Sequence, residues 1–247
     1  MRQILGLFES ANIPTIPYKG PLLTTLVYGN LALRPFGDLD ILIQKRDFLK
    51  AKDLLLAQGY RLKTPLASTG EETFLKSKSA FGFVHPEGKI IVDLHWGITY
   101  LKYFFFPLDM RRTWDDLEFV PLAGTKVRNL APETLLSILC VHGSTHAWER
   151  LKWVCDVSEM VRTYPQLDWN CILDQAQALG HMRMLLLGLN LANTLLEVPL
   201  PMKVRKAIEA EPKVKSLAAT AQRWMLVEID KQPSTTTEGD AFRLKLL

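Results

Sequence analysis

The segment that most constrains the fold is residues 36–43, FGDLDILI, whose pattern predicts a glycine turn that leads into an apolar strand. Side chains two residues apart in a strand project from the same face, so we expect Asp38 and Asp40 to lie about 6–7 Å apart along the chain. The apolar residues between and after them would then point into a core. Two carboxylates held together at the start of a buried strand repel each other unless a cation neutralises them. The segment therefore predicts a strand with a cation site on one face.

A second apolar segment, IIVDLH at residues 90–95, offers a third carboxylate, Asp93, between apolar neighbours. Mg²⁺ is a hard ion that suits one or two carboxylates together with substrate phosphates. Three acids on two strands can hold a pair of metal ions about 3.5–4 Å apart, which is the arrangement that drives in-line phosphoryl displacement. We therefore expect Asp38, Asp40 and Asp93 to bind Mg²⁺, with Mn²⁺ as the alternative ion.

The order of these motifs resembles the DNA polymerase beta-like nucleotidyltransferase superfamily, and most closely its bacterial branch of uncharacterised nucleotidyltransferases. The superfamily carries a Gly-Ser turn, an Asp-x-Asp strand and a third Asp on a later strand. The bacterial branch has Lys-Gly in place of Gly-Ser, an Arg before the Asp pair, and a later His-Gly-x-x-His-x-Trp-x-x-Leu-Lys-Trp helix. The residues of this chain that match are Lys19-Gly20, Arg34, Asp38, Asp40, Asp93-Leu94-His95-Trp96 and residues 142–153. The resemblance covers about residues 13–200.

This resemblance implies an enzyme that moves an NMP from an NTP, with ATP as the expected donor, to a hydroxyl group and releases pyrophosphate. In the superfamily the first two acids bind both metal ions, which places that role on Asp38 and Asp40. The third acid, Asp93 here, binds the catalytic ion and helps to activate the attacking hydroxyl. Small bacterial enzymes of the superfamily modify antibiotics or proteins, so the resemblance implies a small-molecule or protein acceptor.

Lys19 and Gly20 precede a predicted helix and are the expected phosphate-binding residues. A helix N-terminus presents free N–H groups to anions, and a glycine lets a phosphate approach closely. The chain departs from the superfamily here, because the Ser that touches the triphosphate is missing and Pro21 removes one N–H. Arg34 either binds phosphate bidentately or solvates its loop. His95, two residues after Asp93, either orients that acid, touches phosphate or is a structural histidine.

The expected acceptor site lies between residues 93–96 and a helix at residues 142–152. Its proposed contacts are His95, His142, His146, Trp148 and Lys152. The i, i+4 spacing of the two helical histidines is also that of a zinc site. However, the Glu of a His-Glu-x-x-His metalloprotease is missing and no third ligand is evident. Hydrogen bonding between the helical and catalytic halves is the alternative role of this segment.

Periodicity predicts an α+β protein, with a small mixed sheet followed by a helical bundle. The resemblance implies that the half with the sheet is the nucleotidyltransferase core. The predicted domains are a catalytic core at 1–130, a helical domain at 131–231, and a linker and tail at 232–247. The predicted helices are 2–10, 20–28, 46–58, one from Pro132, 148–164, 169–179, 182–196, 202–209 and 214–229. The predicted extended segments are 14–18, 38–44, 60–63, 73–76, 81–85 and 90–96, with a hairpin of 118–121 and 126–130 through Ala123-Gly124.

Composition narrows the functional classes. A net charge of +4 fits an anionic substrate without indicating a nucleic-acid binder, which would show a concentrated basic face. The basic residues between 203 and 223 are diluted by acids, so a solvated helix face is the default and an RNA- or tRNA-modifying enzyme the alternative. Three cysteines without metal-type spacing indicate reduced thiols in a cytoplasmic protein, and no stretch is long enough to span a membrane. A second alternative is a non-catalytic, antitoxin-like module of the same fold.

Overall fold

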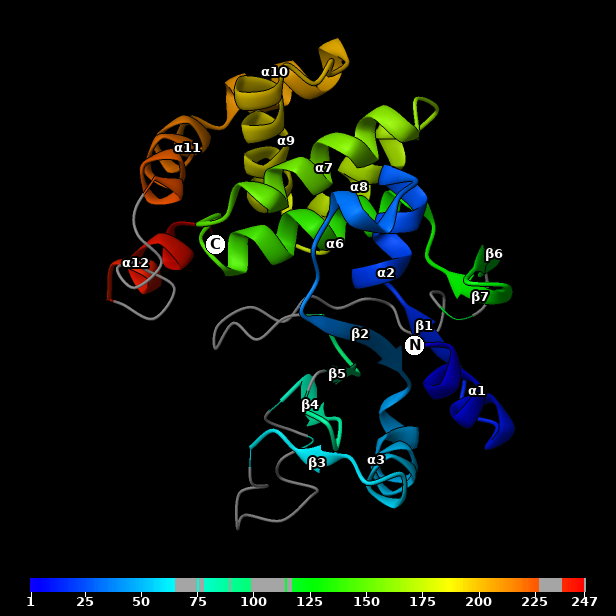
Figure 1. Ribbon diagram of the computed structural model, residues 1–247. Coiled ribbons are helices and arrows are strands. Elements are labelled where there is room, and N and C mark those ends of the chain that lie inside the picture. The colour runs from blue at the N-terminus through cyan, green and yellow to red at the C-terminus, as the bar shows by residue number, and fades with distance from the viewer. Residues whose placement is uncertain are drawn as a thin grey trace. The chain divides into compact units, whose positions relative to one another are not determined.

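The computed structural model describes residues 1–64, 75, 78–88, 90–98, 114, 117–226 and 237–246, which form two compact units (Figure 1). The described residues up to Ala131 form a unit built on a β-sheet, called the sheet unit below. Those from Pro132 onward form a second unit made of helices, called the helical unit. This architecture confirms the predicted α+β class, with a small mixed sheet followed by a helical region. Among the described residues, no helix combines the length and the apolar character needed to cross a bilayer.

The sheet has five strands in the order β1-β2-β5-β4-β3. Their bounds are Thr15–Pro17 (β1), Asp38–Ile43 (β2), Arg61–Leu62 (β3), Ala80–Val84 (β4) and Ile91–His95 (β5). The central strands β2 and β5 run parallel, and the other neighbouring pairs are antiparallel. The extended segments predicted in these regions are therefore strands of one mixed sheet. The segment predicted at 73–76 lies almost wholly outside the described residues.

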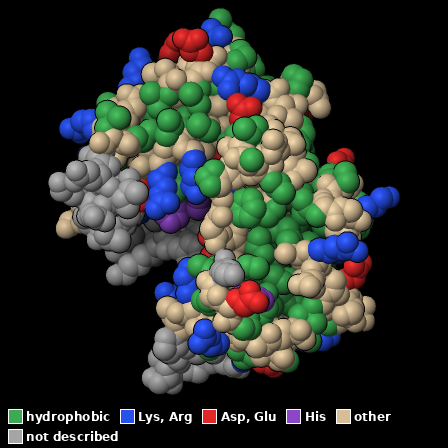
Figure 2. All heavy atoms as spheres, in the orientation of Figure 1, with side chains coloured by type: hydrophobic (Ala, Val, Ile, Leu, Met, Phe, Trp, Pro, Cys, Tyr) green, Lys and Arg blue, Asp and Glu red, His purple; other side chains and the backbone are tan. Residues whose placement is uncertain are grey.

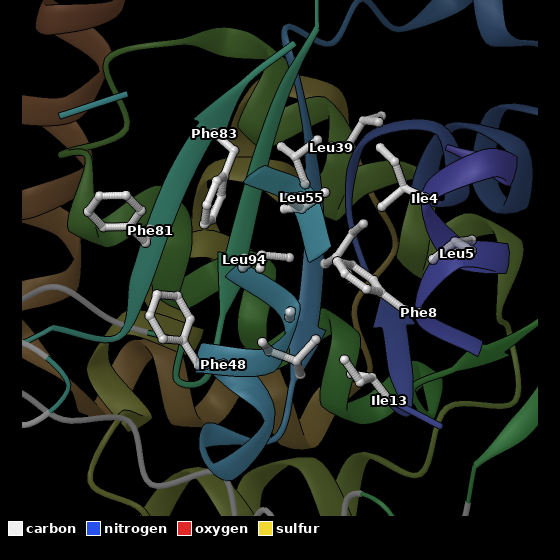
Figure 3. Packing of buried hydrophobic residues seen from close by; sticks show 14 of the residues in the cluster. Ile4, Leu5, Phe8, Ile13, Leu39, Phe48, Leu55, Phe81, Phe83 and Leu94 are labelled. Atoms are coloured by element: carbon white, nitrogen blue, oxygen red, sulfur yellow. The ribbon is translucent and has the colours of Figure 1, made fainter. Parts of the chain in front are cut away.

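One face of this sheet is apolar because of the alternation along each strand. Leu39 of β2 is the register partner of Val92 of β5, which in turn pairs with Phe83 of β4. These side chains pack against α1 (Arg2–Ser10) and α3 (Phe48–Ala57) in one buried cluster (Figure 3). In Figure 3, Phe8 of α1 and Phe48 of α3 point into this cluster from their helices. The opposite face is consequently left for the polar residues of the same strands.

Shorter elements complete the sheet unit. They are α2 (Gly20–Leu23), a π-helix at Thr24–Tyr28, 3-10 helices at Leu31–Leu33 and Lys45–Asp47, and the hairpin of β6 (Glu118–Leu122) and β7 (Thr125–Asn129). The hairpin was expected because two residues, Ala123 and Gly124, join the strands. Both have positive φ, 50° and 78°, as a two-residue type I′ turn requires.

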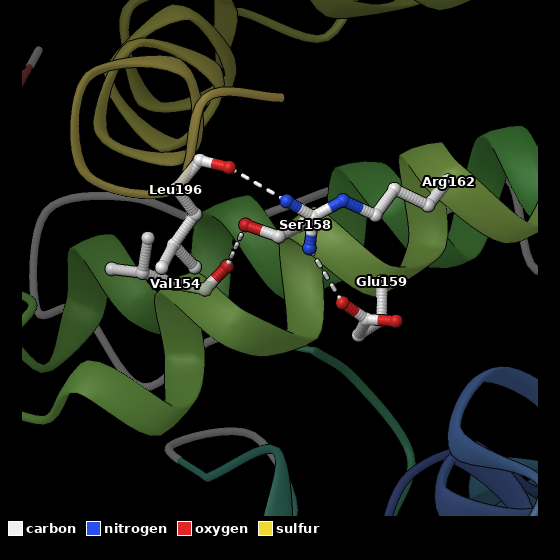
Figure 4. A network of polar contacts seen from close by, with 5 residues as sticks. All are labelled: Val154, Ser158, Glu159, Arg162 and Leu196. Atoms are coloured by element: carbon white, nitrogen blue, oxygen red, sulfur yellow. Dashed lines mark hydrogen bonds and ion pairs between the residues drawn. The ribbon is translucent and has the colours of Figure 1, made fainter. Parts of the chain in front are cut away.

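The helical unit is arranged around α9, which packs against α6, α7 and α11. Its helices are α6 (Pro132–Thr145), α7 (Leu151–Thr163), α8 (Trp169–Ala178), α9 (Met182–Leu196), α10 (Met202–Ala210), α11 (Pro212–Met225) and α12 (Thr237–Leu246). Polar contacts fix α7 to the end of α9: the Arg162 guanidinium donates to the Leu196 carbonyl at 2.6 Å and to Glu159 at 2.7 Å (Figure 4). Ser158 donates to the Val154 carbonyl one turn earlier at 2.8 Å.

One feature of the helical unit differs from the prediction. Residues 142–153 are not one helix, because α6 ends at Thr145 and α7 begins at Leu151. The last described residues, 237–246, form helix α12, within the stretch predicted as a linker and tail. Arg243 on α12 anchors it by donating to the Thr145 carbonyl at 2.9 Å, and Phe242 packs against Trp224 with ring centroids 5.1 Å apart.

Candidate functional site

The three predicted acids lie on the polar face of the sheet. The register of β2 and β5 places Asp40 directly opposite Asp93 and Asp38 opposite Ile91. Directly paired residues project to the same side, so all three carboxylates share one face. Asp40 is 6% exposed, whereas Asp38 and Asp93 are half-buried. His95, two residues after Asp93 on β5, lies on this face as well.

Asp40 contacts both a histidine and a lysine side chain. Its Oδ1 lies 2.9 Å from His95 Nε2 and 3.1 Å from Lys19 Nζ. Both partners are buried, and each meets the ring of Tyr18: His95 edge-on at 5.3 Å, and Lys19 with its Nζ 5.0 Å from the ring centroid. The buried negative charge of Asp40 is thus balanced by a buried positive charge, as a carboxylate in a dry environment requires. His95 contacts Asp40, which was not among the roles expected for it.

Gly20 fits its place for a steric reason. Its φ is +52°, and a Cβ there would lie 3.1 Å from the Asp38 carbonyl oxygen. Only glycine adopts this conformation without cost. Lys19, in extended conformation, precedes the short helix α2. The close approach brings the Lys19-Gly20 turn against the start of the acidic strand.

Two residues next to Asp93 were missed by the sequence analysis. A Cβ on Gly82 of β4 would lie 2.7 Å from Asp93 Oδ1 and 2.8 Å from Lys63 Cδ. Gly82 therefore leaves the space that the Asp93 carboxylate and the Lys63 stem occupy. The available signal was a glycine inside an aromatic strand, Phe81-Gly82-Phe83, since such a glycine often marks a close approach.

One group of three side chains among the described residues can hold a metal ion. Asp40, Asp93 and His95 each offer one ligand atom, and these atoms lie within 4.8 Å of one another. Two carboxylate oxygens suit a hard divalent cation such as Mg²⁺ or Mn²⁺. Asp38 stands on the same face one strand repeat before Asp40.

Arg34 is buried, 6% exposed, at the end of the 3-10 helix that precedes β2. The phosphate role expected for Arg34 stays a prediction, as does the phosphate role of Lys19 and Gly20.

The other predicted acceptor residues belong to the helical unit. His142 and His146 are half-buried, and their ring centroids are 4.7 Å apart. The Trp153 ring meets His142 at 84° and 5.5 Å, and His146 at a tilt of 34° and 5.2 Å. Lys152 is half-buried near the start of α7. The three rings form an aromatic cluster, and the role of His142, His146 and Lys152 towards an acceptor stays a prediction.

Trp148 is completely buried in the same unit. Ala147 and Trp148 both have left-handed backbone, with φ of 54° and 55°. The backbone N–H of Trp148 donates to the Gly143 carbonyl at 2.8 Å, and the backbone N–H of Ala147 donates to the Ser144 carbonyl at 3.0 Å. This is the hydrogen-bond pattern of a Schellman turn. The indole folds back over Gly143, where a Cβ would lie 2.6 Å from the ring. A substitution of Trp148 would therefore affect packing first.

The cysteines lie outside this site. All three are free thiols, and Cys140 is fully buried on α6. Burial raises the pKa of Cys140, Cys155 and Cys171, so the thiols stay protonated near neutral pH. They lack the lowered pKa of a catalytic nucleophile.

Comparison with known proteins shows which family the chain belongs to. The profile of a family described as "Uncharacterised nucleotidyltransferase" matches residues 1–197. A search of curated proteins gives no significant match.

Solved structures with a similar fold are remote in sequence. The crystal structure of ANT(2″)-Ia in complex with adenylyl-2″-tobramycin is 12% identical, covers 72% of this chain and 94% of that chain, and has a TM-score of 0.47. The solution structure of the antibiotic-resistance factor ANT(2″)-Ia is 15% identical, with coverages of 90% and 92% and a TM-score of 0.39. An antigenic nucleotidyltransferase-like protein from Paracoccidioides brasiliensis is 18% identical, with coverages of 84% and 90% and a TM-score of 0.44. At these values the likenesses carry no function over to this chain.

Proposed function

Because the chain belongs to the uncharacterised nucleotidyltransferase family, we propose that it transfers an NMP from an NTP, with ATP as the expected donor, to a hydroxyl group. The observation that carries the proposal is the juxtaposition of Asp40, Asp93 and His95, whose ligand atoms lie within 4.8 Å of one another on adjacent parallel strands. A paired-acid site on this face is what metal-assisted phosphoryl transfer needs.

The donor set fits Mg²⁺, with Mn²⁺ as the alternative. Asp40 and Asp93 would hold the ion, and His95 would hold Asp40 in place. Asp38 and Asp40 together would form the pair of acids that faces the triphosphate. The Asp40 carboxylate also contacts the Lys19 ammonium at 3.1 Å, so a positive charge lies beside the proposed ion site. When bound, the ion would neutralise the triphosphate oxygens and polarise the α-phosphorus.

The chain's own residues would do the rest of the chemistry. Lys19 and the N–H groups at Gly20 would bind the triphosphate and stabilise the leaving pyrophosphate. Asp93 would take the proton of the acceptor hydroxyl, whose oxygen forms a bond to the α-phosphorus as the bond to pyrophosphate breaks. Arg34 would add positive charge on the phosphate side.

We favour a small molecule or a protein as the acceptor. On the face drawn in Figure 2, Lys and Arg side chains are dispersed among other atoms rather than gathered into one stripe, unlike a nucleic-acid groove. Acceptor contacts stay a proposal for the half-buried His142, His146 and Lys152, whereas the completely buried Trp148, also expected to contact the acceptor, would act first through packing. We also propose a cytoplasmic location, because three cysteines without regular spacing suit a reducing compartment.

The test is transfer of label from [α-³²P]ATP in the presence of Mg²⁺, together with pyrophosphate release. Wild type should label one member of a panel of hydroxylated small molecules that includes an aminoglycoside, host proteins and host RNA. Asp93→Asn should lower turnover by about a thousandfold, the order seen when one group acting only in the transition state is lost. Asp53→Asn is the matched control, since that acid is 72% exposed on α3.

Two results would contradict the proposal. The first is the absence of pyrophosphate release and of Mg²⁺-dependent ATP binding in the wild type, which together with a co-purifying protein partner would indicate the non-catalytic module. The second is full activity in Asp93→Asn, which would remove that acid from the chemistry.

A further inference from the structure

The face that carries the acids continues beyond them onto the edge strand of the sheet. Asp40 pairs with Asp93, and Asp93 pairs with Gly82 of β4. The Lys63 N–H donates to the Gly82 carbonyl at 2.9 Å, which extends this row by one residue on the β3 side. The row therefore runs from two acids through a glycine to a lysine.

A second row runs parallel to the first. Asp38 pairs with Ile91, Ile91 with Val84, and Val84 with Arg61 of β3. Arg61 and Lys63 are two residues apart in the chain, and the residue between them, Leu62, packs against the apolar core on the other face. By alternation both basic side chains belong to the face of the acids.

The position of the Lys63 side chain supports this assignment directly. A Cβ built on Gly82 would lie 2.8 Å from Lys63 Cδ and 2.7 Å from Asp93 Oδ1, so both side chains approach the same point. The lysine stem thus crosses Gly82 towards the third acid. Gly82 is what lets the two side chains share this space.

Exposure increases along the row, from Asp40 at 6% through the half-buried Asp93 to the exposed Lys63. Positive charge consequently flanks the acids on both sides. Lys19 contacts Asp40 from the β1 side, where Gly20 also closes on Asp38. On the β3 side the Lys63 stem approaches Asp93, and Arg61 lies on the same face in the row of Asp38. In the proposed reaction the triphosphate uses the Lys19 side, so the second basic pair is available to the other substrate.

We infer that Arg61 and Lys63 bind an anionic group, a phosphate or a carboxylate, that the acceptor carries beside its reacting hydroxyl. The inference rests on the proposed function, because it assigns the Asp93 side of the site to the acceptor. Two cations at an exposed edge attract an anion and repel a polycation by the same Coulomb interaction. Polycationic acceptors are therefore disfavoured, and small phosphorylated or carboxylated hydroxyl compounds are favoured.

The test measures binding rather than turnover. The wild type is first saturated with Mg²⁺ and the non-transferable analogue α,β-methylene-ATP, and then titrated calorimetrically with glycerol 3-phosphate, glycerate, glycerol and spermidine. The first two probes distinguish a phosphate from a carboxylate requirement, and glycerol is the neutral control. The variants are Lys63→Met, which keeps the stem over Gly82, and Arg61→Gln. Lys126→Met on β7 is the matched control for the loss of one exposed charge.

We expect the wild type to bind one of the two anions at least tenfold more tightly than glycerol, and not to bind spermidine. Each site variant should lower the affinity for that anion by about tenfold, which corresponds to the loss of one charge-assisted hydrogen bond. The affinity for the analogue should stay unchanged. Lys126→Met should match the wild type. Equal binding of glycerol and both anions by the wild type would overturn the inference. A loss of analogue affinity in the variants, with anion affinity intact, would instead make the pair a triphosphate site and overturn it too.

A separate titration distinguishes failure of the anion site from failure of the proposed nucleotidyl transfer. Inorganic phosphate is titrated without metal or nucleotide into the wild type and Lys63→Met. Failure of the analogue to bind in the presence of Mg²⁺ contradicts the proposed nucleotidyl transfer. In that case weaker phosphate binding by Lys63→Met still supports the anion site, and equal binding by the two proteins overturns it.

Discussion

Glycines make room for a large side chain in both units of this molecule, but they admit different kinds of group. In the sheet unit, Gly82 leaves space for the Asp93 carboxylate and the stem of Lys63. In the helical unit, Gly143 and Gly188 leave space for the indole of Trp148, which is fully buried. The first space is polar, half-exposed and beside a group of potential metal ligands. The second is closed and apolar.

The difference separates chemistry from packing within one set of motifs. Both regions lie within residues 1–197, which match the family profile, and that match alone does not say which part reacts. The structure gives the strand motif an ion pair and a neighbouring carboxylate. It gives the later motif a helix-ending turn, in which two left-handed residues are held by the buried indole. A shared motif can therefore mark either a reactive site or a turn.

The largest effect is expected for Trp148→Ala in the helical unit. Removing a fully buried indole costs about 3–5 kcal/mol, and it also removes what holds the strained turn. Chemical denaturation should show this loss of unfolding free energy, whereas the half-buried Trp169→Ala should cost clearly less. Equal costs for the two variants would mean that the turn at Ala147 and Trp148 does not depend on the indole.

Gly82→Ala probes the corresponding space in the sheet unit. The new Cβ would have to displace the Asp93 carboxylate or the flexible Lys63 side chain. We expect a 10- to 100-fold loss of nucleotidyl transfer, about 1.4–2.7 kcal/mol in the barrier, with a much smaller change in Tm. Gly6→Ala, where nothing lies within 4 Å, is the control. A loss of stability without a selective loss of turnover would make Gly82 a packing residue like Gly143.

The smallest effect concerns a buried titratable group in the helical unit. Asp40 in the sheet unit has charged partners, whereas burial alone lowers the pKa of His181 from 6.5 to about 4. The unfolded chain therefore binds the proton more readily, so the free energy of unfolding falls as the pH drops from about 6.5 towards 4. The loss should be roughly 1–2 kcal/mol between pH 7 and pH 5. His181→Gln should flatten this part of the pH profile, and a profile identical to that of the wild type would contradict the assignment.

The sequence predicted the local features of the site better than the long-range ones. The acidic strand follows from the alternation of Asp38 and Asp40 with apolar residues, and the core face follows with it. The ion pair of Lys19 with Asp40 and the contact of His95 with Asp40 could not be predicted, because they depend on strand register and on backbone far away in the chain.

The prediction of one helix over residues 142–153 was wrong for a different reason. The resemblance implied one helix over residues 142–153, and no glycine stands at positions 147 and 148, where the backbone becomes left-handed. Ala147 and Trp148 take left-handed conformations that neither prefers, because the Trp148 indole is buried against Gly143. Tertiary packing overrides local preference here, and a single sequence does not reveal it.

The central claim is that the strand acids bind a divalent ion that recruits the nucleotide. Isothermal titration of Mn²⁺ in the presence of α,β-methylene-ATP tests this claim directly in wild type, Asp40→Asn and the exposed control Asp53→Asn. We predict metal-dependent nucleotide binding in wild type and Asp53→Asn, and metal affinity lowered by about a hundredfold in Asp40→Asn, since a hard cation loses a carboxylate ligand. Nucleotide binding that needs no metal, with equal metal affinity in all three proteins, would contradict the account.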